Sequence, residues 1–141
     1  MVEGTINGFH FQAPLEPDGE GGHWLRVDPA MRDATGGKVG ATLTLAIGAA
    51  KKWPEPQLPD DLEKALATNP SVQELWLKIT TKARWEWIRW IRSTNNPQTR
   101  KIRIEKACSM LVSGKRRPCC FNSSQCTEPS VSKNGVLLVP A

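Results

Sequence analysis

The residues best suited to binding chemistry in this sequence are basic side chains that recur at helical spacing. They are Arg89, Arg92, Arg100, Arg103 and Lys106. Because residues three apart are neighbours on a helix surface, this spacing predicts one contiguous cationic stripe. Asn96-Pro97 is typical of a helix N-terminus. Thr99 and Arg100 follow it, and with Arg103 one turn further on they predict a pocket for a small anion.

Aromatic side chains lie close to these cations along the chain. Four tryptophans fall within 15 residues, namely Trp76, Trp85, Trp87 and Trp90. Trp87 stands at core spacing, whereas Trp85 lies roughly 160° from it around a helix and is expected to be partly exposed. Trp85 and Arg89 are four residues apart, a spacing suited to a cation–π contact. Trp85 and Trp90 are therefore interpreted either as an aromatic platform for a flat ligand or as packing residues.

The charge along the chain is uneven, which leaves more than one interpretation of the stripe. Residues 1–77 hold 6 Lys or Arg and 11 Asp or Glu, whereas residues 78–117 hold 12 and 2. The basic block is suited to an acidic protein, an anionic ligand or a nucleic-acid backbone. The same charges would also serve as a solvated face, or as ion-pair partners of the acidic front half.

Motifs for catalysis and metal binding are missing from the sequence. It contains no GxSxG, Walker A, HExxH or GxGxxG motif. His10 and His23 have no carboxylate at a spacing that would make either a general base. Cys119, Cys120 and Cys126 lack a second ligand pair at zinc spacing and are interpreted as reduced thiols. We therefore expect a non-enzymatic protein without metal or cofactor.

The sequence carries no recognisable membrane or secretion signal. No stretch approaches the roughly 18 apolar residues of a membrane span. Met1 is followed by an acidic, glycine-containing segment instead of a basic and then apolar one. A cytoplasmic protein without membrane insertion is expected.

The first 48 residues are predicted to be mainly β-structure. Segments 3–6 and 9–13 flank Asn7-Gly8, a pair that favours a type I′ hairpin turn. The further elements expected are a polar loop over 14–22, a strand over 23–27, a short helix over 29–35 and a strand over 42–47. Asp28-Pro29 should begin the helix and Gly36 should end it. The last strand alternates strictly, with Leu43, Leu45 and Ile47 on one face.

Beyond a proline-rich linker at 49–59, the pattern becomes helical. Helices are predicted over 61–67, 70–79, 82–93 and 97–113. Asp60 and Glu63 form the pattern of a capping box, and Thr80 or Thr81 is expected to begin the third helix. The apolar positions predicted to form the core are Val72, Leu75, Trp76, Ile79, Trp87, Ile88, Ile91, Ile104, Ala107, Cys108 and Leu111.

The helical block contains a pattern that resembles a known family. It consists of Leu58-Pro-Asp-Asp-Leu62, Trp87-Ile-Arg-Trp90-Ile91, Pro97-Gln-Thr-Arg100, Arg103-Ile104 and Met110-Leu111 before Gly114. This pattern resembles the bacterial YdeI/OmpD-associated family, whose members are called bacteriocin-protection proteins. The resemblance implies protection against bacteriocins or cationic peptides and association with a porin, without an agreed catalytic reaction.

The segment from Gly4 to Ile47 resembles the second half of the small β-barrel domain that commonly precedes this family. Its order of elements is also similar to the swapped-hairpin units of AbrB- and MazE-like proteins. That similarity is carried by Leu25-Arg-Val-Asp-Pro29, Met31-Arg32 and 37–45. Because Met1 stands almost at the first hairpin, half of the barrel is expected to be absent. Either the remnant is rebuilt around the helices or a second copy supplies the other half, and unpaired strand edges favour such a homodimer.

These observations predict an α+β protein. It has a partial (half) double-split β-barrel at 1–48, a proline-rich linker at 49–59, a helical module at 60–114 and a polar tail at 115–141. The leading function is binding or stress protection, as the resemblance implies. Two alternatives are an AbrB-like nucleic-acid-binding regulator and a small-ligand-binding protein that uses Trp85 or Trp90 with Arg100.

Overall fold

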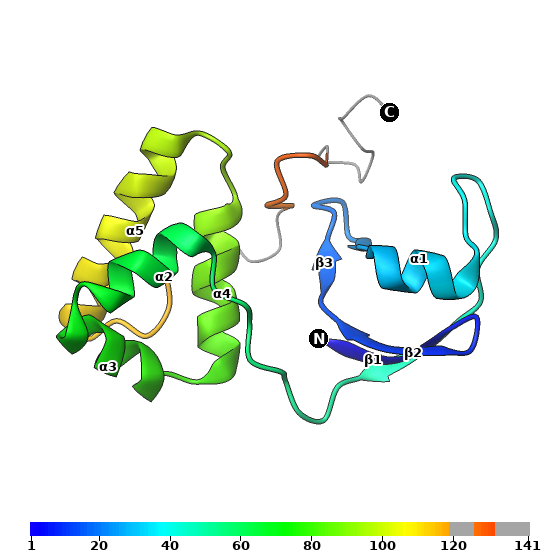
Figure 1. Cartoon of the computed structure of the whole chain (residues 1–141), viewed down its shortest axis with the longest axis horizontal. Coiled ribbons are helices and arrows are strands. Elements are labelled where there is room, and N and C mark those ends of the chain that lie inside the picture. The colour runs from blue at the N-terminus through cyan, green and yellow to red at the C-terminus, as the bar shows by residue number, and fades with distance from the viewer. Residues whose placement is uncertain (119–125, 132–141) are drawn as a thin grey trace.

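The computed structural model describes residues 1–118 and 126–131, which form two lobes joined by a proline-rich segment (Figure 1). The β lobe contains β1 (Val2–Ile6), β2 (Phe9–Ala13), β3 (Leu15–Pro17), β4 (His23–Leu25), α1 (Pro29–Thr35) and β5 (Leu45–Ala49). The helical module contains α2 (Asp60–Ala67), α3 (Pro70–Lys78), α4 (Thr81–Arg92) and α5 (Pro97–Val112). The predicted α+β class is confirmed, and the strands described do not close into a barrel.

A three-stranded antiparallel sheet in the order β2-β1-β5 forms the base of the β lobe. Its hairpin turn is the predicted Asn7-Gly8, with φ of 47° and 82°, and Ile6 pairs with Phe9. β5 approaches β1 so closely that a Cβ on Gly4 would lie 1.9 Å from the Ala46 carbonyl oxygen. A glycine at position 4 is therefore required for this strand pairing.

The expectation of a loop over 14–22 is wrong for its first part. β3 lies within it and pairs with β4 in a separate two-stranded sheet. Asp18 closes the turn between them, because its Oδ1 accepts hydrogen bonds from the backbone of Glu20 at 2.7 Å and Gly22 at 2.9 Å. The strand predicted over 23–27 is shorter than expected and ends at Leu25.

The short helix of the β lobe has its predicted limits. Asp28 accepts a hydrogen bond from the backbone N–H of Met31, and Gly36 ends α1 with φ of 65°. α1 contacts β2, and Met31 is buried. The last strand starts later than predicted, and Leu45 and Ile47 are 46% and 40% exposed. The apolar face expected to be buried is thus left half-exposed in a single chain.

α3 and α5 begin at the predicted residues, and α4 begins one residue earlier than predicted, after Thr80, one of the two caps expected for it. Thr80 caps α4 through the backbone N–H of Ala83 at 3.1 Å, and Asn96 caps α5. The capping box predicted for α2 is wrong. The N-cap is Pro59, whose carbonyl accepts the Glu63 N–H at 2.9 Å, so Asp60 already lies inside the helix.

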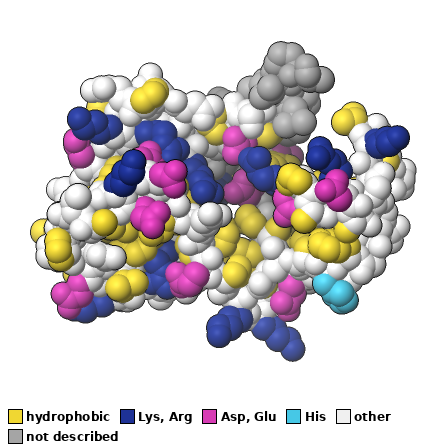
Figure 2. Space-filling model, in the orientation of Figure 1, with side chains coloured by type: hydrophobic (Ala, Val, Ile, Leu, Met, Phe, Trp, Pro, Cys, Tyr) yellow, Lys and Arg dark blue, Asp and Glu magenta, His cyan; other side chains and the backbone are white. Residues whose placement is uncertain are grey.

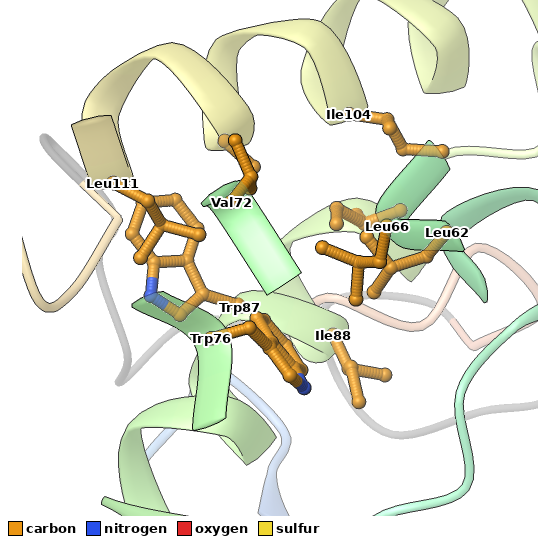
Figure 3. Packing of buried hydrophobic residues seen from close by; sticks show 10 residues of the cluster. Leu62, Leu66, Val72, Trp76, Trp87, Ile88, Ile104 and Leu111 are labelled. Carbon is orange, nitrogen blue, oxygen red and sulfur yellow. The ribbon is translucent and has the colours of Figure 1, made fainter. Parts of the chain in front are cut away.

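The main hydrophobic core lies within the helical module (Figure 3). Its buried members are Leu62, Leu66, Val72, Trp76, Trp87, Ile88, Ile91, Ile104, Ala107 and Leu111, and Cys108 packs partly buried against them. Trp87 is fully buried, and its indole Nε1 donates to the Arg116 carbonyl at 2.9 Å. The chain beyond α5 therefore turns back onto α4.

The middle of the proline-rich segment, residues 53–55, is bound to α4. The Trp85 indole donates to the Pro54 carbonyl at 2.7 Å, and Lys82 lies 5.8 Å from the centre of the Trp53 ring. Glu55 pairs with Arg84, and Thr81 Oγ1 donates to the same carboxylate at 2.9 Å. Residues 50–59 contain no helix or strand, whereas Ala49, the first residue of the predicted linker, still belongs to β5.

Several predicted features fall outside the described residues. These are Cys119, Cys120 and most of the polar tail predicted at 115–141. In the part of the chain that is described, no helix is long and apolar enough to cross a membrane.

Candidate functional site

Two of the predicted cations bind other parts of the helical module. Arg100 donates from Nε and Nη2 to the two carboxylate oxygens of Asp61 at 2.8 and 2.9 Å. These hydrogen bonds lower the pKa of Asp61 and raise the pKa of Arg100. Arg103 donates to the Trp90 carbonyl at 3.0 Å and to Ser93 Oγ, and its guanidinium lies 5.8 Å from the centre of the Trp90 ring. Both arginines therefore join helices to one another.

The predicted small-anion pocket at the start of α5 is already occupied by protein groups. Asn96 Oδ1 accepts from the backbone N–H groups of Gln98 and Thr99 at 3.0 and 3.1 Å. These N–H groups are among the donors that an anion at a helix N-terminus would use. Thr99 is half-buried, and Lys106 lies exposed further along α5. Anion binding by this set stays a prediction.

The two tryptophans considered as an aromatic platform are both half-buried. Trp85 binds the Pro54 carbonyl through its indole N–H. Trp90 stands edge-on to Trp87, with ring centroids 5.9 Å apart and planes at 73°. Packing thus uses part of each ring, and a platform role stays a prediction.

Arg84 belongs to the same basic block in the sequence but is only 9% exposed. Its guanidinium donates to Glu55 Oε2 at 3.1 Å and to the Ile79 carbonyl at 2.6 Å. Carbonyl groups at a helix C-terminus lack partners within the helix. Arg84 therefore stabilises the end of α3 and holds the proline-rich segment at the same time.

A group of polar side chains lies where the two lobes meet, and we call it the interlobe cluster. The β lobe contributes Glu16 of β3, Trp24 of β4 and Arg26, which follows β4. α4 contributes Arg89 and Arg92, and segment 126–131 contributes Thr127 and Glu128. The described segment 126–131 lies between α4 and β3 (Figure 1). Figure 2 shows basic and acidic side chains gathered where the two lobes meet. The cluster therefore combines three regions that are distant in sequence: the β3–β4 hairpin with Arg26, α4, and segment 126–131.

Direct contacts connect several members of the interlobe cluster. Arg26 Nη2 forms an ion pair with Glu128 at 2.9 Å, and Arg26 Cζ lies 5.7 Å from the centre of the Trp24 ring. Arg89 Nε donates to Thr127 Oγ1 at 3.0 Å. Arg89 and Arg92 thus face the β lobe, whereas Arg100 and Arg103 bind within the helical module. The structure divides the predicted stripe into two parts.

Burial and charge act in opposite directions on the ionisable groups of the cluster. Burial raises the pKa of Glu16, while Arg89, Arg26 and Arg92 act to lower it and Glu128 adds to the rise. Burial also lowers the pKa of Arg89, against the effect of the Glu16 charge. Ionisable groups with such shifts are concentrated in functional sites, although structural ion pairs show them too.

Sequence reasoning identified Arg89 and Arg92 but missed the other members of the cluster. Glu16 stands in a segment predicted to be a polar loop, and Trp24 and Arg26 in a strand with no chemical motif. The available signal was Pro17-Asp18-Gly19, which is typical of a turn between two strands. Recognising that turn would have placed Glu16 opposite Trp24, as the structure does.

The structure places the candidate metal ligands apart. His10 lies on β2 and His23 on β4, in different sheets, and both are exposed. Within residues 1–118 and 126–131, no three His, Cys, Asp or Glu side chains are grouped as metal ligands would be.

Comparison with known families gives one match for each lobe. Residues 1–47, which span most of the β lobe, match a domain of unknown function (DUF1905). No curated protein and no solved structure matches the chain. Residues 55–114, which contain the helical module, match the family described as "Bacteriocin-protection, YdeI or OmpD-Associated". The helical module therefore belongs to the YdeI/OmpD-associated family, and the β lobe in front of it matches DUF1905.

Proposed function

We propose that this protein is a non-enzymatic binding protein that helps a bacterium withstand bacteriocins. The observation that carries this proposal is the match of residues 55–114 to a family described by bacteriocin protection. That description names a biological effect, so binding is the molecular activity proposed to produce it.

The distribution of charged side chains supports binding through exposed cations. Arg84, Arg100 and Arg103 are bound within the protein. The exposed basic side chains of the helical module and its C-terminal extension include Arg92, Lys101, Lys106, Lys115 and Arg116. Exposed cations attract anionic surfaces and increase the rate of association with them. An acidic protein surface is the partner that we propose.

We also propose a cytoplasmic location and a homodimer. Cys108 and Cys126 are free thiols, which is the state that a reducing compartment maintains. The exposed Leu45 and Ile47 lie on β5, an edge strand of the sheet. Such an edge offers unpaired backbone groups to a second strand, which supports pairing between two copies.

The proposed protection is tested by expressing the chain in a bacteriocin-sensitive bacterium and measuring survival during challenge. Expression should raise survival, and Lys101→Gln with Lys106→Gln should reduce the gain because both cations are exposed. Arg32→Gln with Lys38→Gln is the matched control, since these exposed cations lie on the β lobe. Equal survival with and without the chain contradicts the proposal, provided that the soluble protein is present in the cells.

The nucleic-acid alternative has less support from the structure than from the sequence. A continuous stripe of cations could follow a phosphate backbone, but Arg100 and Arg103 of the predicted stripe bind protein groups instead. A DNA titration at several salt concentrations separates the two functions, because phosphate contacts give an affinity that falls steeply with salt. Such binding, weakened by Arg92→Gln, would favour the regulator.

A further inference from the structure

The indole of Trp24 has an unused hydrogen-bond donor. Its Nε1 is buried, and none of the described residues accepts a hydrogen bond from it. Buried polar groups in proteins are nearly always paired, and those that are not call for a specific explanation, such as an absent ligand. An acceptor oxygen brought by a ligand would satisfy this N–H.

Glu16 lies directly opposite Trp24 and also lacks a close partner. The two residues are register partners in the β3–β4 pair, so their side chains project from the same face of that sheet. Among the described residues, none forms a hydrogen bond or an ion pair with the Glu16 carboxyl. Two polar groups without a hydrogen-bond partner thus lie on one face of the β3–β4 sheet, and the charges of Arg89 and Arg92 on α4 act on one of them, Glu16.

The charges around these two groups favour an anion. The cluster contains three guanidinium groups, from Arg26, Arg89 and Arg92, and two carboxyl groups, from Glu16 and Glu128. Arg26 and Glu128 neutralise each other at 2.9 Å. Arg92 is exposed and forms no hydrogen bond or ion pair with any described residue. Arg92 therefore brings to the cluster a positive charge that no described residue pairs with, and protonation of Glu16 would remove a negative charge beside it.

We propose that the interlobe cluster binds a compact oxyanion, a phosphate or a carboxylate, between the Trp24 indole N–H, the Glu16 carboxyl and the Arg92 guanidinium. Each of these groups supplies one element of recognition. Trp24 donates a hydrogen bond, protonated Glu16 donates a second, and Arg92 donates while balancing charge. The ligand connects the two lobes, because Trp24 and Glu16 belong to the β lobe and Arg92 to α4.

The site makes anion binding depend on pH. Ionised Glu16 repels an anion, whereas protonated Glu16 donates to it, so the affinity should rise as pH falls through the titration of this carboxyl. Arg89 and Arg92 from α4, Arg26 after β4, and Glu128 from segment 126–131 face Glu16 and set where it titrates. Burial raises the pKa of Glu16, which brings the effect closer to neutral pH.

The experiment is a calorimetric titration of the full chain with sulfate and, separately, with acetate. Sulfate reproduces the shape of phosphate without titrating, and acetate represents a carboxylate. Ionic strength is held constant with chloride from about pH 5 to about pH 8. We expect saturable binding of one anion per chain. Trp24→Phe and Arg92→Gln should each weaken it about tenfold, as expected for the loss of one hydrogen bond to a charged group.

Two further variants separate a specific site from general charge. Glu16→Gln should still bind the anion but without the dependence on pH. Arg32→Gln removes an exposed cation on α1 and should change nothing. Tighter binding of sulfate than of acetate assigns the site to phosphate, and the reverse assigns it to carboxylate.

The proposal is overturned if neither anion binds saturably, or if Trp24→Phe, Arg92→Gln and Arg32→Gln bind alike. It is also overturned if Glu16→Gln retains the full pH dependence. Circular dichroism shows whether Trp24→Phe is folded, and should it unfold, Arg92→Gln and Glu16→Gln decide, because both keep the apolar contacts of the sheet. None of these outcomes depends on bacteriocin survival.

Discussion

Arg84 of α4 donates a hydrogen bond to Glu55 of the proline-rich segment at 3.1 Å, across 29 residues of sequence. The same guanidinium binds the Ile79 carbonyl at the end of α3. The side chain of Arg84 is 11% exposed and that of Glu55 is 63% exposed. One buried cation thus holds together two parts of the chain, and the hydrogen bond lowers the pKa of Glu55.

Arg84→Met should reduce the free energy of unfolding by about 2–3 kcal/mol, because hydrogen bonds from a charged donor are lost while the apolar stem is kept. Urea denaturation measures the change. Lys78→Met is the matched control, since Lys78 pairs with Glu74 at 3.3 Å on the exposed surface of α3 and should cost about 0.3–0.5 kcal/mol. Equal effects of the two substitutions would contradict the role assigned to Arg84.

Gly4→Ala should separate β5 from β1. The added methyl group would lie 1.9 Å from the Ala46 carbonyl oxygen, a distance that only a shift of the backbone can relieve. We expect a loss of more than about 2 kcal/mol in unfolding free energy, the size of other severe backbone conflicts. Gly48→Ala on the partner strand is the control, because a Cβ there meets nothing within 4 Å. A Gly4→Ala variant as stable as Gly48→Ala would show that the two strands are not held this closely.

The Asp61–Arg100 pair should make stability depend on pH in the acid range. Because the pair lowers the pKa of Asp61 from its usual 3.8, the unfolded chain binds more protons there than the folded one. The stability from this pair is therefore present above the usual pKa and is lost as pH falls through the lowered value. Its size should be below about 1 kcal/mol, since both side chains are partly exposed.

Denaturation curves at a series of acid pH values measure this dependence in the wild type and two variants. Asp61→Asn should flatten the slope, and Asp60→Asn is the matched control at the neighbouring position. Glu16 gives a trend of opposite sign, because its raised pKa means that the folded state gains stability as pH falls. A slope that Asp61→Asn leaves unchanged would assign the acid sensitivity to other carboxyl groups.

The proposed homodimer should have twice the 15.6 kDa mass of one chain in light scattering coupled to size exclusion. Ile47→Glu should dissociate it, because a charge would be buried in the interface of the edge strand β5. Leu77→Glu is the control, since Leu77 is 69% exposed on α3, away from this edge. A wild-type mass of one chain at high concentration would rule out the dimer.

Features determined by neighbouring residues were predictable from the sequence. Asp28-Pro29 and Asn96-Pro97 each begin a helix, because a capping side chain and a fixed proline φ act within one turn. Trp87 was correctly placed in the core by helical spacing. Asp60 was misplaced by one residue, because Pro59 already supplies the extended conformation of a cap. At α2, therefore, the local capping rule identified the correct turn of the chain but not the residue that begins the helix.

Features determined by long-range contacts were not predictable. Pairing of the basic block with the acidic front half was one interpretation left open by the sequence, but nothing beside Arg84 shows that Glu55 is its partner. Arg89 and Arg103 were assigned to one stripe from spacing alone. Helical spacing holds within a helix, but the turn between α4 and α5 and the position of the β lobe decide which surface each side chain meets. The interlobe cluster therefore became visible only in three dimensions.

The contacts of the proline-rich segment determine where this chain can be recombined with a relative. Trp53, Pro54 and Glu55 all bind α4, whereas the Ala50 N–H donates to the Met1 carbonyl at 3.1 Å in the β lobe. A chimaera joined at the end of the prolines would pair a foreign segment with α4 and lose the Arg84 ion pair. The better crossover point is Lys51-Lys52, whose side chains are exposed. The hydrogen bond that Gln12 donates there goes to the backbone carbonyl of Lys52, which any residue supplies. A crossover there keeps residues 53–59 with their own helices, and the contacts that a foreign DUF1905 half must then supply are those of the interlobe cluster, such as the Arg26–Glu128 ion pair.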